Sequence, residues 1–191
     1  MASFKTVVVD TDLLICGGGM AACGAAVEAA YWAKQHGLKV TLVDKAAMDR
    51  SGAVAMGLSA INLYLDHSSG DNTLRDYVDY VRNDLMGITR EDLVANIARH
   101  VDGTVHLFEK WGLPIWKNDQ GRYVHEGRWQ VMINGESYKV IVAEAAKKAL
   151  AEAGGQYIER VFITHPLMEG DRCVGAIGFS HAAGGGLFCF D

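Results

Sequence analysis

The residues of this sequence whose types and spacing could do chemistry begin with a glycine cluster near the amino terminus. Gly17, Gly19 and Ala22 form the pattern Gly-x-Gly-x-x-Ala, and Asp44 follows later in the chain. In such a turn the first glycine permits a tight bend and the second lets the backbone approach a diphosphate, while the small third residue allows close helix–strand packing. A carboxylate placed like Asp44 can accept hydrogen bonds from ribose hydroxyls. The motif therefore predicts a dinucleotide site.

Such a motif needs a strand before it and a helix after it, and the sequence supplies both. The apolar run 13–16 predicts a strand buried on both faces of a parallel sheet. The Ala-rich segment 20–36 predicts a helix that Gly37 ends, and residues 39–44 predict a second strand that closes with Asp44. This order of elements is that of a nucleotide-binding α/β unit.

The rest of the chain predicts more helices and an antiparallel tail. Apolar residues at helical spacing predict helices over 72–86, over 91–111 behind Thr89 as N-cap, and over 140–153. Turn residues surround Pro114 and 118–121. The tail predicts three antiparallel strands, over 157–164 and ending before Pro166, then over 173–180, and finally, after a turn at 184–186, over 187–190.

The composition excludes several classes of protein. Of the 191 residues, 50% are hydrophobic and 21% are charged, which is enough for a packed core and unlike a disordered or fibrous protein. The net charge is −5 and no basic run is present, so we expect no nucleic-acid partner. The sequence has no apolar window long enough for a membrane span and no signal-peptide pattern at its start. We therefore expect no direct membrane span and a cytoplasmic location.

The four cysteines argue against a metal centre in this chain. They include no C-x-x-C pair and no cluster with histidine, so we expect neither zinc nor an iron–sulfur cluster, and we expect reduced core thiols. These cysteines are Cys16, Cys23, Cys173 and Cys189.

The nucleotide unit does not settle which dinucleotide is bound, because nicotinamide and flavin enzymes share it. Residues 49–62 are small and glycine-bearing, so their backbone could lie against a flat ring system. A plain loop is the alternative, and composition does not choose between the two.

Four stretches resemble the α subunits of dissimilatory adenylylsulfate reductases, in the fumarate reductase and succinate dehydrogenase flavoprotein superfamily. The similarity runs from about Asp12 to Ser180; the first stretch is shared by many flavoproteins and the others are narrower. The stretches are GGGMAACGAAVEAAYWAK, VTLVDKAAMDRSGAVAMGLSAIN, REDLVANIARHVDGTVHLFEKWGLPIWK and GRWQVMINGESYKVIVAEAAK.

This resemblance implies a Rossmann-like FAD-binding domain with a parallel sheet, helices and an antiparallel β meander, covering residues 1–191 as the amino-terminal part of a longer chain. We expect the second glycine motif and the capping domain beyond it. The resemblance implies two-electron interconversion of adenylylsulfate with sulfite plus AMP, and an iron–sulfur β subunit that carries 4Fe-4S clusters. FAD should be non-covalent, because residues 50–53 lack the histidine that attaches flavin in covalent members of the superfamily.

The resemblance also implies catalytic residues. Asn62 would lie beside the reacting edge of the flavin, Glu126 would position substrate or handle a proton, and Tyr80 would lie near the substrate channel. From the residues alone, a turn asparagine, a solvated glutamate and a core tyrosine stay open. Met56 departs from the glutamine usual in the family. Together, the motif and the resemblance predict as cofactor-binding residues Gly17, Gly19, Ala22, Asp44, Lys45, Ser51, Gly52, Ser59 and Asn62.

Two other functions remain open from the sequence. A fumarate reductase-like enzyme would keep the flavin and act on a dicarboxylate. A non-catalytic nucleotide-binding or subunit-docking module would keep the fold without the reaction.

Overall fold

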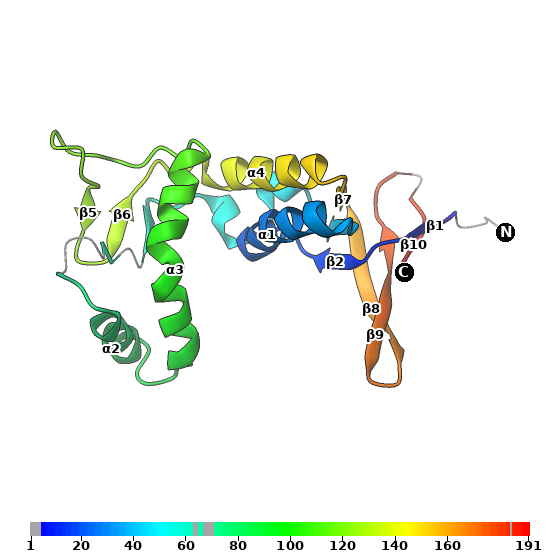
Figure 1. Cartoon of the computed structure of the whole chain (residues 1–191), viewed down its shortest axis with the longest axis horizontal. Helices are drawn as coiled ribbons and strands as arrows, with labels where there is room; N and C mark the ends of the chain where they lie inside the picture. Colours follow the sequence, from blue (N-terminus) through cyan, green and yellow to red (C-terminus); the bar gives the residue numbers. More distant parts are fainter. Residues whose placement is uncertain (1–4, 63–64, 67–70, 184) are drawn as a thin grey trace. The chain divides into compact units, whose positions relative to one another are not determined.

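The computed structural model of the chain describes residues 5–62, 65–66, 71–183 and 185–191. They form two compact units, a first unit of residues 1–56 and 139–191 and a second unit of residues 57–138 (Figure 1). Both units mix helices with strands, so the predicted α/β class is confirmed. The single FAD-binding domain expected over residues 1–191 stays a prediction.

A three-stranded parallel sheet lies at the centre of the first unit. Its strands are β2 (Leu13–Cys16), β3 (Val40–Asp44) and β7 (Gln156–Glu159), in the order β2-β3-β7. All five residues of β3 are buried. The prediction that residues 13–16 are buried on both faces is wrong, because β2 lies at the sheet edge and exposes Leu13 and Cys16. The central strand of the sheet, with a neighbouring strand on each side, is β3.

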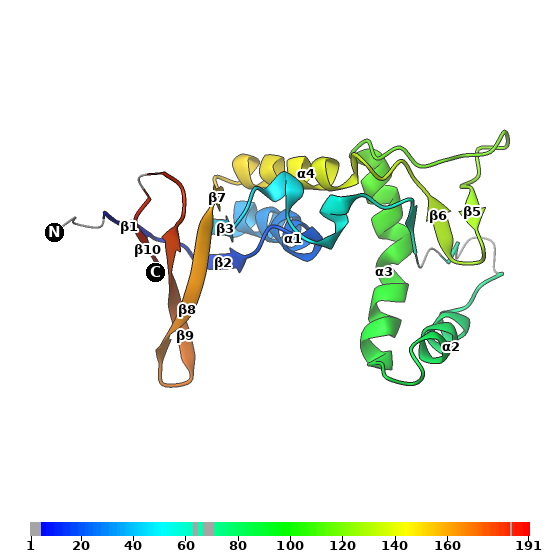
Figure 2. The ribbon, with the colours of Figure 1, turned by 180° about the vertical axis from the view of Figure 1, so that it is seen from behind.

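Helices α1 (Met20–His36) and α4 (Tyr138–Glu152) lie side by side on this sheet (Figures 1 and 2). The α1 helix has the predicted limits, and Gly37 ends it in a left-handed conformation with φ 68°. Small residues at helical spacing make its buried stripe, which allows a close approach to β3. The stripe consists of Cys23, Ala26, Ala30 and Ala33.

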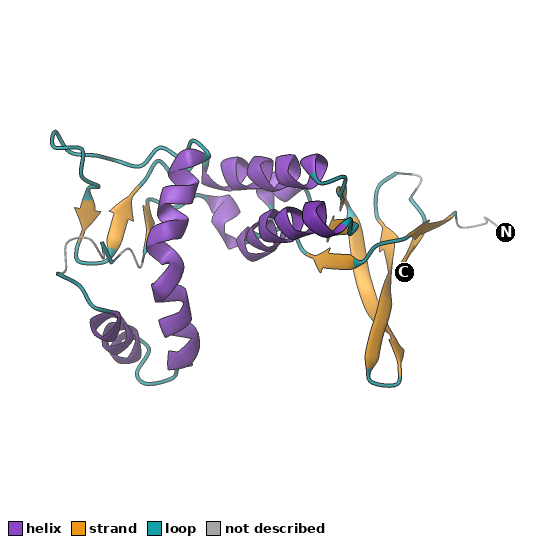
Figure 3. Cartoon of the chain, viewed as in Figure 1, coloured by secondary structure: helices purple, strands orange, loops and turns teal. Residues whose placement is uncertain are grey.

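An antiparallel meander covers the other face of the parallel sheet (Figure 3). It contains β1 (Thr6–Val9), β8 (Val161–Glu169), β9 (Arg172–Ser180) and β10 (Leu187–Phe190), in the order β1-β10-β9-β8. Only the β1–β10 pair is parallel. The core between the two sheets joins Val43 of β3 to Val9, Val161, Ala176 and Phe190. Helices, parallel sheet and meander thus form three layers.

The strand predicted over 157–164 is divided in the structure. It ends in β7 at Glu159, and Arg160 has a φ of 62°, after which β8 begins. The expected stop before Pro166 is also wrong, because β8 continues through it. Proline lacks an N–H group and is tolerated in edge strands, and β8 lies at the edge of its sheet. Strand β1 was not predicted, and Gly184 of the predicted turn is outside the described residues.

The first unit also contains two short 3-10 helices after β3. They are η1 (Met48–Arg50) and η2 (Ala53–Met56). Between them lie Ser51 and Gly52, two of the predicted cofactor-binding residues.

The second unit consists of two helices and a small antiparallel sheet. The helices are α2 (Leu74–Asp84) and α3 (Glu91–Lys110), and the sheet has the order β4-β6-β5. Its strands are β4 (Ala60–Ile61), β5 (His125–Glu126) and β6 (Gln130–Met132), none of which was predicted.

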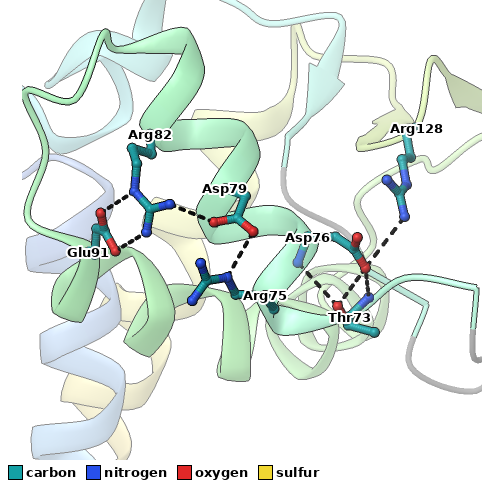
Figure 4. A network of polar contacts seen from close by, with 7 residues as sticks. All are labelled: Thr73, Arg75, Asp76, Asp79, Arg82, Glu91 and Arg128. Atoms are coloured by element: carbon teal, nitrogen blue, oxygen red, sulfur yellow. Dashed lines mark hydrogen bonds and ion pairs between the residues drawn. The ribbon is translucent and has the colours of Figure 1, made fainter.

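Polar contacts fix both ends of α2 (Figure 4). Thr73 caps the helix, accepting from the Asp76 N–H while Asp76 accepts from the Thr73 N–H. The helix is therefore shorter than predicted. Arg82 joins Asp79 to Glu91, the first residue of α3. The N-cap of α3 is Arg90, so the Thr89 prediction is wrong by one residue.

Candidate cofactor site and active-site residues

The glycine turn connects β2 to α1 in the manner that an anion site requires. Gly17 has a φ of 114°, a conformation that favours glycine, and its N–H donates to Val43 O at 2.7 Å. Gly19 is the N-cap of α1, and no side chain caps this end. The first N–H groups of a helix have no partner within the helix, and they carry its positive dipole end. This end of α1 can therefore bind a phosphate.

Asp44 ends β3 beside this turn. The residue is only 3% exposed, and its Oδ2 atom has no hydrogen-bond partner in the part of the chain that the structure describes. A Cβ atom built on Gly18 would lie 2.6 Å from that oxygen. A buried carboxylate oxygen without a donor is costly. The arrangement is therefore suited to a ligand that donates hydroxyl hydrogen bonds to Asp44.

A second backbone segment approaches the glycine turn. Gly52 has a φ of 83°, and a Cβ built on it would lie 2.9 Å from the Cα atom of Gly19. Ser51, half-buried, precedes it. Two glycine backbones thus face each other with no side chain between them. This close approach leaves backbone groups accessible to a diphosphate.

Two other predicted cofactor residues of the first unit lie at its margins. Ala22 is half-buried in the first turn of α1. Lys45 is exposed, with its Nζ atom 5.9 Å from the ring centroid of Phe162, and its carbonyl oxygen bonds to His181. The structure therefore groups seven predicted residues in one unit: Gly17, Gly19, Ala22, Asp44, Lys45, Ser51 and Gly52.

The second unit brings Asn62 and Glu126 to one end of its small sheet. Val131 of β6 pairs with both Ile61 of β4 and His125 of β5. Asn62 follows Ile61 and Glu126 follows His125, and both β4 and β5 run antiparallel to β6. Asn62 and Glu126 therefore lie at the same end of the sheet. Glu126 pairs with Gln130 and so lies on the face opposite the buried Val131. Both Asn62 and Glu126 are exposed.

Ser59 and Tyr80 are tied to the same sheet. The carbonyl oxygen of Ser59, just before β4, accepts from the Ile133 N–H at 2.9 Å. Tyr80, half-buried on α2, has its ring centroid 5.7 Å from that of Trp129, which immediately precedes β6. Trp129 is buried. Of the predicted catalytic residues, Glu126 therefore lies in the β5–β6 hairpin, and Asn62 and Tyr80 lie beside it.

Tyr77, whose ring contacts that of Tyr80, is more deeply buried than Tyr80. Tyr77 is buried with Leu65, Ala98 and Trp129, and burial raises its pKa to about 12. This tyrosine is therefore a neutral hydrogen-bonding and packing group at ordinary pH.

Sequence reasoning missed two residues of the first-unit site. Gly18 occupies a variable position of the Gly-x-Gly-x-x-Ala motif, although the space beside Asp44 admits no side chain there. Lys139 lies just before the helix predicted over 140–153 and has no predicted role, although it is only 1% exposed. The run of three glycines, Gly17-Gly18-Gly19, is a sequence signal for Gly18. Nothing in the local pattern marks Lys139.

A comparison with known proteins identifies the nucleotide. Residues 12–186 match the family described as the FAD binding domain. The chain belongs to this family. FAD is the family's cofactor, and the glycine turn, the unpaired Asp44 oxygen and the facing Gly52 backbone fit a bound dinucleotide. The flavin prediction is thereby confirmed over the nicotinamide alternative.

Similar proteins agree with this assignment. The adenylylsulfate reductase subunit alpha of Megalodesulfovibrio gigas is 52% identical, and the match covers 88% of this chain and 28% of the relative. The structure of adenylylsulfate reductase from Archaeoglobus fulgidus is 60% identical with a TM-score of 0.89, covering 98% of this chain and 30% of that one. This chain thus spans less than a third of the length of either protein.

A more distant structure shares the fold alone. The quinol fumarate reductase of E. coli is 18% identical with a TM-score of 0.74, and the match covers 96% of this chain and 31% of that one. The family match and the 60% identical structure confirm the predicted FAD-binding fold.

The cysteines differ from the prediction of core thiols. Cys23 is buried, whereas Cys16 and Cys173 are exposed; all four are free thiols. Within residues 5–62, 65–66, 71–183 and 185–191, no group of three or more His, Cys, Asp and Glu side chains could hold a metal ion. No helix among these residues is long and apolar enough to cross a membrane.

Proposed function

We propose that this chain is the FAD-binding part of an adenylylsulfate reductase α subunit, an oxidoreductase that interconverts adenylylsulfate with sulfite plus AMP. The observation that carries this proposal is the identity of 52% and 60% to two such reductases over nearly the whole chain. The quinol fumarate reductase of E. coli, at 18% identity, gives the dicarboxylate alternative much weaker support. The glycine-turn geometry is common to both enzymes and does not discriminate between them.

The first-unit residues act in this proposal by holding the cofactor. The N-terminal N–H groups of α1 and the backbone at Gly17, Gly19 and Gly52 bind the diphosphate. Asp44 accepts hydrogen bonds from a ribose, which gives its Oδ2 atom the donors that it lacks. Ala22, Lys45 and Ser51 complete this side of the site. The flavin, when bound, converts between one-electron and two-electron transfer.

The second-unit residues act on the substrate. The amide of Asn62 orients a sulfate oxygen by donating a hydrogen bond. Glu126, exposed at the same end of the sheet, positions substrate or accepts and returns a proton. Ser59 holds the start of β4 through its backbone, and Tyr80 borders the substrate channel while it packs on Trp129.

The cofactor, the partner and the location complete the proposal. FAD is bound non-covalently. Electrons reach it from an iron–sulfur β subunit with 4Fe-4S clusters, the partner that the resemblance to adenylylsulfate reductases implies. We place the complex in the cytoplasm, where the four free thiols would stay reduced.

Absorbance and turnover of the complete protein test this function. After gentle purification we expect flavin absorbance, bleaching by a reductant, and return of the oxidised spectrum on addition of adenylylsulfate. Reoxidation by fumarate with no response to adenylylsulfate would select the dicarboxylate alternative. Bound FAD that responds to neither substrate would select the non-catalytic module.

A further inference from the structure

Lys139 is a buried lysine for which the described part of the chain provides no ion pair. It is 1% exposed at the start of α4. Its Nζ atom donates to Met48 O and to Cys23 Sγ, the latter at 3.6 Å. Within the described residues, no carboxylate lies within ion-pair distance of it. Buried lysines are usually paired with an opposite charge, so the burial of Lys139 without an ion pair requires an explanation.

The two contacts of Lys139 connect it to both sides of the cofactor site. Cys23 lies in the first turn of α1, where its N–H donates to Gly19 O at 2.9 Å and its Sγ to Gly18 O at 3.5 Å. Met48 O belongs to η1, which leads directly to Gly52 and its contact with Gly19. Lys139 therefore supports the glycine turn and the segment that faces it.

The charges around Lys139 leave a place for an anion. Burial raises the pKa of the Cys23 thiol, with a smaller opposing effect of Lys139, so the thiol stays neutral. Asp44 lies within electrostatic reach of Cys23 but forms no ion pair with Lys139. Lys147, a second cation on this side, is paired with Asp49 and Glu144.

An ammonium beside a helix N-terminus is unfavourable in two ways. It lies at the positive end of the α1 dipole, and it is removed from water. Both penalties decrease when an anion binds at the same end. A diphosphate is such an anion, and the glycine turn is built to receive one.

We propose that Lys139 is a positioning residue for FAD, whose buried ammonium offsets the diphosphate charge and holds the Met48–Gly52 segment against the glycine turn. This inference rests on FAD as the cofactor of the proposed function.

Two substitutions separate the charge from the hydrogen bond. Lys139→Gln keeps a donor for Met48 O and removes the charge, whereas Lys139→Met removes both. Lys148→Met is the matched control, because Lys148 lies on the same helix with a side chain 79% exposed. Dissociation constants for FAD, ADP and adenosine are measured on the apo form of the complete protein.

Loss of the Lys139 charge should weaken the binding only of ligands that carry a diphosphate. We expect the Kd of FAD and ADP to rise about tenfold in Lys139→Gln, from a charge interaction across a few ångströms at intermediate dielectric. Adenosine binding should not change, and Lys148→Met should match the unsubstituted protein. A Kd for FAD within twofold of the unsubstituted value in Lys139→Gln would overturn the proposal.

Thermal unfolding distinguishes this role from simple structural support. Removing an unpaired buried charge should leave the Tm of the apo form unchanged or raised, and should reduce the increase in Tm that FAD produces. An apo form that is unfolded in both Lys139 variants would show a structural anchor and refute the proposal. Failure of the unsubstituted protein to bind FAD would refute the proposed function as well.

Discussion

Gly18 and Asp44 lie so close together that only a hydrogen atom fits at the α-carbon of Gly18. A Cβ built there would stand 2.6 Å from the Asp44 Oδ2 atom. The carboxylate is buried and this oxygen has no partner in the described structure. The glycine turn therefore fixes where the carboxylate lies, and the carboxylate in turn dictates glycine at position 18.

Gly18→Ala should displace Asp44 and weaken FAD binding. Overpacking costs about 1–3 kcal/mol, so we expect the Kd of FAD to rise roughly tenfold or more, measured by quenching of flavin fluorescence. Gly24→Ala is the control, because a Cβ there meets nothing within 4 Å. Alanine in the middle of α1 should raise stability by about 0.5–1 kcal/mol. Equal FAD affinity in both variants would contradict the contact.

Asp44→Asn should separate cofactor binding from folding. The amide keeps the shape but replaces one acceptor by a donor, so we expect FAD affinity to fall roughly tenfold. The apo form should be no less stable, since a buried carboxylate without a donor is removed. Isothermal titration and thermal unfolding measure the two effects. Asp171→Asn, in the exposed turn before β9, should leave both unchanged; an apo form destabilised by Asp44→Asn would argue against a ligand-directed oxygen.

Glu126→Gln should lower turnover without loss of the flavin. The side chain is exposed at the end of the small sheet of the second unit, whereas the glycine turn belongs to the first unit, so the ratio of flavin to protein absorbance should stay constant. If Glu126 transfers a proton, kcat should fall by about a hundredfold. Glu136→Gln, also exposed in the second unit, should keep full activity. A kcat within twofold of the unsubstituted enzyme would leave Glu126 as a solvated loop residue.

Thr73→Ala should destabilise the protein at neutral pH by removing the N-cap of α2, at a cost of about 1 kcal/mol. The Thr73 hydroxyl and N–H lower the pKa of Asp76 below its usual value. A carboxyl with a lowered folded-state pKa adds stability above its unfolded pKa, and this stability is lost as pH falls through the folded value. The difference between Thr73→Ala and the unsubstituted protein should therefore decrease at about pH 3, below the unfolded value of about 3.9.

Urea unfolding at both pH values measures this difference. Thr104→Ala is the control, because Thr104 lies inside α3 and bonds back to His100 O. Its effect should be small and independent of pH in this range. A Thr73→Ala effect that is unchanged at low pH would show that Asp76 does not contribute through the cap.

Local pattern was sufficient where a segment's own residues decide its conformation. The alanine run predicted α1 from Met20 to His36, and Gly37 ends it as expected, because helix propensity and a left-handed cap are local properties. Local pattern was less reliable for burial, because the burial of a strand depends on its neighbours in the sheet. Leu13 and Cys16 have the composition of a doubly buried strand, yet β2 lies at an edge and exposes both.

The sequence by itself determined the glycine turn, the helix after it and the carboxylate at the end of β3, because each follows from the composition and spacing of its own segment. Only the tertiary structure decided that Gly18 adjoins Asp44, that β6 brings Asn62 and Glu126 to one sheet end, and that Lys139 is buried beside Cys23. Each of these depends on contact between residues far apart in the chain. Strand pairing and side-chain packing set such contacts, and neither leaves a period in the local sequence.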